Sequence, residues 1–370
     1  MATHLILMLL ATRHHYNERV RNIPIRGRAA VTGFLLLLPA AMALGPQPAD
    51  AGPAARFSQS VAVGSSPILR VNLRVGSVEI RTWNRPTIGI QSTAGLTIRH
   101  FGAQAVAANM RSDLPIFSST TNSRFGPVTL GQETFDLSSM SANPHDAVAV
   151  RSAGGWVGVR IEIPANTALV LANVGAGRIS MRGYRSGTFV ARVHTGRILM
   201  RNMGGTGFAE VVRGAIFIAG SSFERLRVRT AVGPIVCERC TVRQIDATSI
   251  AGSIGYDNGT FQSGLAHFES QYGNVAIGVR AGGAQIAAHS SSGRIYSRFD
   301  DGANVTGSAR NRNATVGGGG PVVTASSGAG AVFLYNGSIT AHRSLARAWQ
   351  PIRRIVVWRA PPVPRPRVRH

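Results

Sequence analysis

The chain has 370 residues, enough for two or three average domains or for one elongated repeat domain. It contains 43 glycines, and only 6% of its residues are aromatic, which favours strands and turns because glycine destabilises helix interiors. The formal net charge is +24, and the sequence contains no lysine, so all 40 of its Lys+Arg residues are arginines. A GC-rich coding sequence accounts for this bias, and so does a preference for phosphate or carboxylate partners, which the guanidinium group binds with two parallel hydrogen bonds. In both cases the charge attracts polyanions.

Residues 1–51 have the three parts of a secretory signal peptide. Several arginines between residues 13 and 28 precede an apolar run from Val31 to Leu44, which is shorter than the ~20 residues that span a membrane. Ala41-Met42-Ala43 and Ala49-Asp50-Ala51 both match the small-residue pattern of a cleavage site. We therefore expect cleavage near Ala51 or Ala43 and an exported protein, located in the periplasm, at the cell surface or outside the cell. An uncleaved N-terminal anchor is the alternative.

A Gly-x-Ile/Val triplet recurs at intervals of about nineteen residues. Its glycines are Gly177, Gly196, Gly214, Gly233, Gly252, Gly273 and Gly293, with a further copy at Gly330 beyond a degenerate coil and a lone earlier copy at Gly76. The second and fourth residues after each glycine are mostly apolar, the seventh and fifth before it are apolar or small, and the fourth before it is polar.

This alternation on both sides of a glycine predicts two short strands joined by a bend. One such pair cannot bury its own apolar face, so the coils must stack, each adding about 4.8 Å along the axis. The sequence therefore predicts an all-β protein, a single-stranded β-helix or β-solenoid.

The same pattern divides the rest of the chain. Residues 57–93, around Gly76, are expected to form a first β unit that caps the solenoid, and residues 94–153 a long low-complexity excursion. The repeats occupy residues 154–340. Residues 341–370 form a tail with eight arginines and no acid, and its proline-rich end favours polyproline II. The tail is either a solvated surface or a tether to anionic polymer or lipid headgroups.

Three elements of the sequence together resemble a known family. They are the lone β unit from Leu69 to Trp83, the turn Ile161-Glu162-Ile163-Pro164, and the Gly-x-Ile series from Gly177 onward. Over about residues 57–335 the chain resembles the exported putative-adhesin β-strand-repeat family, a domain family of unknown function. The resemblance implies a β-solenoid in a bacterial envelope or surface setting, and it supplies no catalytic residues. The excursion and the basic tail depart from the family pattern.

The two cysteines form a single C-x-x-C motif, which can be a redox centre, half of a zinc site or a disulfide. Cys237 occupies the repeat position that Met181 and Met200 fill in earlier coils, and Cys240 occupies another apolar position. Both are therefore expected to face the core in a structural role, as thiols or as a disulfide. Zinc is not expected, because a second C-x-x-C is absent.

The sequence offers little support for catalysis. His267 and His289 fall on outward positions of consecutive coils without a carboxylate triad, so no metal is expected. Asp246 and Glu269 differ in repeat position, so no paired carboxylates are expected either. We expect no enzyme and no cofactor, with a polysaccharide-active β-helix enzyme as the alternative. Export and the lack of a reading module argue against nucleic acid as a partner.

Four arginines are the candidate binding residues. Arg178 and Arg182 on one coil should stack against Arg197 and Arg201 on the next. The four guanidinium groups form a patch that can hold phosphate or carboxylate groups, or else they are an ordinary solvated face.

A second candidate surface is apolar. Leu199, Phe217 and Val236 occupy the same outward position in consecutive coils. They predict either a packing surface for the tail, the excursion or another subunit, or a strand that is buried on both sides. The sequence as a whole therefore favours a non-catalytic envelope or surface protein, an adhesin or scaffold that binds anionic glycan or lipid. A self-associating structural β-solenoid is the alternative.

Overall fold

The computed structural model of the chain describes residues 57–101, 119–123, 126–130, 147–152, 155–280, 282–299 and 303–342. The expected signal peptide and the tail beyond residue 342 lie outside these residues. The described part is all-β apart from one turn of 3-10 helix, η3. Its strands in chain order are β1 (Phe57–Ala62), β2 (Ile68–Trp83), β3 (Thr87–Ser92), β4 (Thr97–Phe101), β5 (Ser119–Ser123), β6 (Gly126–Leu130), β7 (Ala147–Arg151), β8 (Trp156–Pro164), β9 (Leu169–Arg182), β10 (Thr188–Arg201), β11 (Gly204–Ala219), β12 (Ser222–Val232), β13 (Ile235–Glu238), β14 (Thr241–Ala251), β15 (Ile254–Phe261), β16 (Leu265–Ser270), β17 (Val275–Val279), β18 (Ala284–Ser290), β19 (Ile295–Arg298), β20 (Asn304–Gly307), β21 (Asn311–Val316), β22 (Val322–Ser327) and β23 (Val332–Asn336), followed by η3 (Ile339–Ala341).

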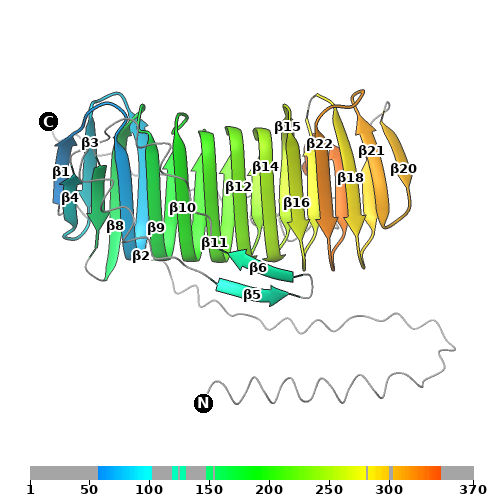
Figure 1. Cartoon of the computed structure of the whole chain (residues 1–370), viewed down its shortest axis with the longest axis horizontal. Helices are drawn as coiled ribbons and strands as arrows, with labels where there is room; N and C mark the ends of the chain where they lie inside the picture. Colours follow the sequence, from blue (N-terminus) through cyan, green and yellow to red (C-terminus); the bar gives the residue numbers. More distant parts are fainter. Residues whose placement is uncertain are drawn as a thin grey trace, which may run out of the picture. The chain divides into compact units, whose positions relative to one another are not determined.

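The middle of the chain stacks in the order of the sequence (Figure 1). β9, β10 and β11 pair in parallel, each shifted by one repeat. β12 and β13 continue the stack on β11, β14 and β15 lie on these, and β16 and β17 follow. β9 to β11 run through the repeat glycine, whereas the later coils break there into two strands. This parallel, in-register stack is an arrangement like that of a β-solenoid.

The repeat glycines form one column through the stack, and the column explains why glycine recurs. Gly177, Gly196 and Gly214 are paired directly with one another. A Cβ atom at Gly196 would lie 1.8 Å from the carbonyl oxygen of Gly177, and φ at Gly196 is +139°. Both the close approach of neighbouring backbones and this dihedral angle exclude side chains.

The residues expected to face inward do so. Ile198 and Met200 after the glycine, and Phe189 and Ala191 before it, are all buried in the main core. The corresponding residues of the other coils share this burial and form one continuous cluster along the stack. The period of two on each side of the glycine therefore identified the core correctly.

At the N-terminal end the order of strands in space departs from the order in the sequence. β2 lies between β8 and β9 and pairs in parallel with both. β3 then pairs antiparallel with β8, β1 with β3, and β4 with β7. The expectation that residues 57–93 simply cap the stack is thus wrong for β2, which is an internal coil; only β1 and β3 lie outside it. The backbone groups of β2 hydrogen-bond on both edges, with β9 on one side and β8 on the other.

The expected excursion over residues 94–153 is too broad. β4 and β7 fall within that range and pair with each other, and β7 also pairs with β2. The four residues from Ala147 to Val150 are all buried, so β7 belongs to the packed part of the stack. Between these strands, β5 and β6 form an antiparallel hairpin, and the remaining residues of 102–146 lie outside the described chain.

The C-terminal end is also interleaved, which corrects two expectations. β22 and β23, which flank Gly330, lie between the coil of β16 and β17 and the coil of β18 and β19. Gly330 is therefore not the last member of the column, because Gly293 follows it in space. The degenerate coil expected between these two glycines is instead a hairpin, in which β21 pairs antiparallel with β18 and β20 pairs antiparallel with β21. A turn in which Ser308 donates its N–H to the carbonyl of Asn311 at 2.6 Å reverses the chain there.

Candidate functional site

The four candidate arginines lie side by side on β9 and β10. Arg197 is paired with Arg178, and Arg201 with Arg182, as the repeat predicted. Arg182 and Arg201 are exposed, and Arg178 and Arg197 are half-buried. Burial lowers the pKa of Arg197, and the positive charge of Arg178 lowers it further. Because the two like charges oppose each other, an anion placed between them would be stabilised. We call these four residues the arginine patch.

The nearest acid on the N-terminal side of the patch is already engaged. Glu79 on β2 accepts a hydrogen bond of 2.8 Å from Nε of Arg81 and one of 3.2 Å from Nε of Arg160. Burial raises the pKa of Glu79, but these two arginines outweigh it, so the pKa lies below its ordinary value. Within the described ranges, no carboxylate forms an ion pair with Arg178, Arg182 or Arg201.

An apolar surface adjoins the patch on its other side. Leu199 lies between Arg197 and Arg201 on β10, and every outward residue of the neighbouring stretch of β11 is apolar. The next coil adds a proline and a valine. We call this surface the apolar strip; it consists of Leu199, Ala215, Phe217, Ala219, Pro234 and Val236.

Farther along the stack, the C-terminal turn covers the same outward row. Val236 is buried in a small cluster with Phe333 and Ile339, against which Phe217 packs in part. Tyr296 stacks on Phe333 with ring centroids 5.2 Å apart. The outward row that contains Phe217 and Val236 is therefore a packing surface, which is one of the alternatives that the sequence left open. The segment that packs on it is the C-terminal turn, residues 337–342.

Asp257 holds this C-terminal turn. Its carboxylate accepts hydrogen bonds from Tyr335 Oη at 3.0 Å, Ser338 Oγ at 2.8 Å and the backbone N–H of Ile339 at 2.8 Å. The N–H of Asn258 also donates to the carbonyl of Gly337 at 3.0 Å. Sequence reasoning missed this role because Asp257 and its partners lie about eighty residues apart in the chain.

The opposite outward face carries paired charges. Arg192 lies 3.3 Å from Glu210 and Arg227 lies 3.1 Å from Asp246. Burial raises the pKa of Glu210, although the charges of Arg192 and Arg229 lower it. Glu210 is itself buried, whereas strand alternation alone predicts an exposed side chain. These acids stand beside arginines rather than beside each other.

The two strand histidines are not neighbours, which corrects the expectation drawn from their consecutive repeats. β22 lies between the strand of His267 and the strand of His289. His267 therefore hydrogen-bonds Thr324 of β22, at 2.8 Å. His289 instead lies 2.6 Å from Oδ1 of Asn311. Across the described stretches, no group of three or more His, Cys, Asp or Glu side chains could hold a metal ion.

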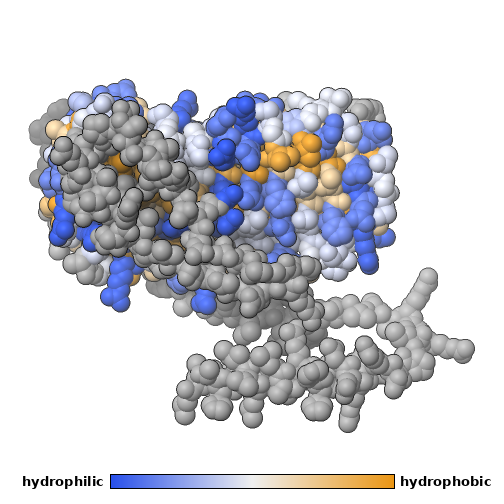
Figure 2. All heavy atoms as spheres, in the orientation of Figure 1, coloured by the Kyte–Doolittle hydropathy of each residue, from blue (hydrophilic) through white to orange (hydrophobic). Residues whose placement is uncertain are grey.

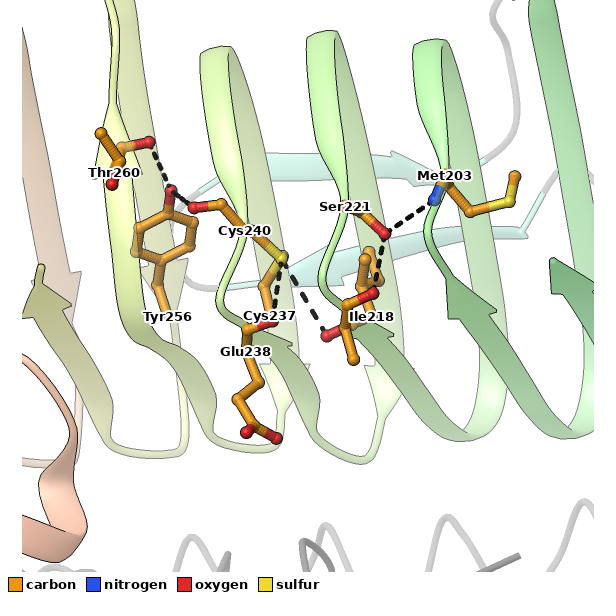
Figure 3. The surroundings of a disulfide bond; sticks show 9 residues. Met203, Ile218, Ser221, Cys237, Glu238, Cys240, Tyr256 and Thr260 are labelled. Atoms are coloured by element: carbon orange, nitrogen blue, oxygen red, sulfur yellow. Dashed lines mark hydrogen bonds between the residues drawn. A yellow bond between two sulfur atoms is a disulfide. The ribbon is translucent and has the colours of Figure 1, made fainter. Parts of the chain in front are cut away.

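The cysteines form a disulfide inside the stack (Figure 3). Both are buried, in agreement with the structural role expected from their repeat positions. The carbonyl of Cys240 accepts a hydrogen bond of 2.8 Å from Tyr256 Oη, which Figure 3 shows one coil away. The disulfide closes the turn between β13 and β14, where one coil leads into the next. Because both cysteines are buried, it offers no exposed sulfur for redox chemistry.

The face of the molecule drawn in Figure 2 is mainly polar. Figure 2 shows blue and white residues over most of the coloured surface, with a short orange band among them. Leu265 and Val322, both exposed, occupy paired positions on β16 and β22. Among the residues described, no helix has the length and apolar character needed to traverse a bilayer.

Comparisons with known proteins add one distant likeness. No protein-family model matches the chain, and no curated protein matches it. A solved structure of a putative cell adhesion protein from Clostridium sporogenes aligns with 76% of this chain and 99% of its own length, at 10% identity and a TM-score of 0.22. With so small a likeness, function has to be argued from the residues of this chain.

Proposed function

We propose that the chain is a non-catalytic exported protein of the cell envelope or surface, an adhesin-like scaffold built as a β-solenoid of about nineteen-residue coils. Its arginine patch binds anionic glycan or lipid headgroups. The observation that carries the proposal is the direct pairing of Arg178 with Arg197 and of Arg182 with Arg201. Paired guanidinium groups on a rigid sheet suit bidentate binding of phosphate or carboxylate.

Two further observations support an extracytoplasmic setting. The sequence of residues 1–51 has the order of a signal peptide. The Cys237–Cys240 disulfide is typical of proteins in oxidising compartments.

A self-associating structural role is the second candidate. Among the described strands, β20 pairs only with β21 and so lies at an edge, and all its residues are exposed. Exposed strand edges are templates for pairing with another chain. Such association depends on backbone hydrogen bonds and would persist at high salt.

The test is fractionation of the native host followed by washing of the envelope in rising salt. We expect release of the wild type by a few hundred millimolar salt, because exposed charges are screened within about 8–10 Å at 0.10–0.15 M. Substitution of all four patch arginines by glutamine should release the protein in low salt. The matched control replaces four exposed arginines elsewhere on the stack by glutamine, and so removes the same charge: Arg225, Arg280, Arg294 and Arg298. Release only by detergent, unchanged by the patch substitutions, would contradict the proposal.

A further inference from the structure

We infer that residues 343–358 of the C-terminal tail dock on the apolar strip of their own chain. They continue the packing that the C-terminal turn, residues 337–342, begins on the same outward row. The inference goes beyond the proposed function, because it holds whichever anion the arginine patch binds.

The described end of the chain already turns toward the strip. β23 ends at Asn336, and three residues later the N–H of Ile339 donates to Asp257 on β15 at 2.8 Å. β17 lies between β23 and β15, so the turn crosses two strand spacings in the direction of the strip. Ile339 then packs with Val236 of β13, and Phe217 on β11 is the next residue of that row.

The tail begins within reach of the rest of the strip. His342, the last described residue, donates from Nε2 to the carbonyl oxygen of Asn336 on β23 at 2.8 Å. Five strand spacings, about 24 Å, separate β23 from β10. About eight extended residues span that distance. Residues 343–358 are therefore long enough to cross the whole strip.

The strip and the tail have matching apolar character. Val236 is buried, whereas the other five residues of the strip are only half-buried. Residues 343–358 carry many large apolar side chains, and from Arg359 onward the sequence is mainly proline and arginine. Apolar side chains of this number are unfavourable in a solvated tail, so they call for a surface to pack on. They are Leu345, Trp349, Ile352, Ile355, Val356, Val357 and Trp358.

Charge defines where on the strip the segment lies. Glu238 on β13 is paired with Ala219 at the edge of the strip, and its carboxylate attracts the arginines of the tail. Arg197 and Arg201 flank Leu199 on β10, and they repel the same arginines. We therefore place the docked segment mainly over β11 and β13.

Two other occupants suit the strip less well. A second copy of the chain carries the same net charge of +24 and is repelled, whereas the tail is tethered beside the strip at an effective concentration of about millimolar. Residues 102–146 leave from β4 and return at β7, which pairs with the part of β2 that precedes Gly76. The strip lies in the other half of the coil, mainly after the repeat glycine.

Photo-cross-linking in the full chain tests the position of the tail. The photoreactive residue p-benzoylphenylalanine replaces Phe217, and the matched control carries it in place of Leu265, an exposed leucine on β16. Dilute protein is irradiated, and the cross-linked peptides are identified by mass spectrometry. Cross-links to Phe333 or Ile339, which belong to the cluster against which Phe217 packs, verify that the probe reacts.

We expect cross-links from position 217 to residues 343–358 of the same chain and none to that segment from position 265. Cross-links confined to residues 333–342 would overturn the inference. So would cross-linked dimers, which would make a second copy the occupant, or cross-links to residues 102–146.

Limited digestion with trypsin tests the same contact without a probe, because the tail supplies its own cleavage sites. In the wild type we expect cleavage after Arg347 and Arg354 to be at least tenfold slower than cleavage after Arg359, which lies beyond the docked segment. Phe217→Ser should abolish this difference, and Leu265→Ser is the control that should keep it. Equal unfolding midpoints of the two variants verify that both fold. Equal cleavage rates at the three arginines of the wild type would overturn the inference.

Discussion

The middle and the ends of the stack follow different rules. From β9 to β17 each coil lies on the coil that precedes it in the sequence, whereas β2 and the coil of β22 and β23 are inserted between coils that are consecutive in the chain. The same glycine column passes through all of them. The repeat therefore determines which residues of two stacked coils are paired. It does not determine the order in which the coils stack.

The ends also change the direction of pairing. β3 and β4 at one end, and β21 at the other, pair antiparallel with the last parallel strands. A parallel edge leaves a row of unpaired backbone groups that invites further stacking. The antiparallel strands occupy part of that edge at both ends. Both ends of the stack therefore have an inserted coil and, beyond it, an antiparallel cap.

The largest expected effect comes from adding a side chain to the glycine column in the middle. At Gly214 a Cβ would lie 1.6 Å from the carbonyl oxygen of Gly196, and φ is +139°. We expect Gly214→Ala to lower the free energy of unfolding by about 3–5 kcal/mol, as strain and overlap combine. Gly95→Ala, with no atom within 4 Å of its added Cβ, is the control for chemical denaturation.

The same substitution at the C-terminal end sharpens the comparison. At Gly293 a Cβ would lie 2.1 Å from the carbonyl oxygen of Gly330, but φ is outside the left-handed range. We therefore expect Gly293→Ala to cost less than Gly214→Ala. Equal or larger destabilisation at Gly293 would mean that the end coils tolerate change no better than the middle.

The next effect concerns the anchor of the C-terminal turn. Asp257→Ala removes the acceptor of three hydrogen bonds and should cost about 1–3 kcal/mol at that end. Hydrogen exchange should increase in residues 332–342 and stay unchanged in β9 and β10. Glu238→Ala, one coil earlier in the same row, is the control. Increased exchange throughout the stack would contradict a local anchor.

The disulfide should contribute about 2 kcal/mol, given the short loop that it closes. We expect reductant to lower the denaturation midpoint of the wild type. In the variant with Cys237→Ala and Cys240→Ala, reductant should have no effect. A midpoint that does not respond to reductant in the wild type would show that the bond adds nothing to this coil.

The smallest expected effect is a pH dependence at His267. The hydrogen bond with Glu269 raises the pKa of His267 from its ordinary 6.5, burial opposes this, and Asp246 on β14 raises it further; Thr324 of β22 is its other neighbour. The same hydrogen bond, opposed by burial, lowers the pKa of Glu269. The stabilisation of the fold by protonated His267 is therefore full below pH 6.5 and is lost as the pH rises through the raised pKa of the folded state. The stabilisation by ionised Glu269 is lost as the pH falls through its lowered pKa.

His267→Gln should accordingly destabilise the protein more at pH 6 than at pH 9. His289→Gln is the control, because His289 contacts Asn311 and Ser291. A difference between wild type and His267→Gln that grows with pH would contradict the assigned charges.

Much of the fold could be predicted because stacking repeats the same local pattern. Ile198 and Met200 were identified as core residues, and Arg178 as a neighbour of Arg197, from the period alone. The position of the Gly330 coil could not be predicted, since its glycine and apolar residues suit either neighbour equally well. The role of Asp257 depends on a fold-back of the chain that no local pattern encodes.

The candidate site was predicted in part for the same reason. The arginine patch follows from two consecutive coils, and so does the position of Leu199 beside it. The engagement of Glu79 by Arg81 and Arg160 depends on the insertion of β2 between β8 and β9. The surroundings of the patch on β2 were therefore visible only in three dimensions.

Disulfide cross-linking in the outward row of Leu265, Val322 and Gln285 tests the interleaved order most directly. Val322 is paired with both other residues, so cysteines at 265 and 322, and at 322 and 285, should each form a bond on mild oxidation. Cysteines at 265 and 285 should remain unlinked, because two strand spacings of about 4.8 Å exceed the ~7 Å limit between Cα atoms of a disulfide. Efficient linkage of 265 with 285, and none through 322, would show that the coils stack in sequence order and would contradict the account.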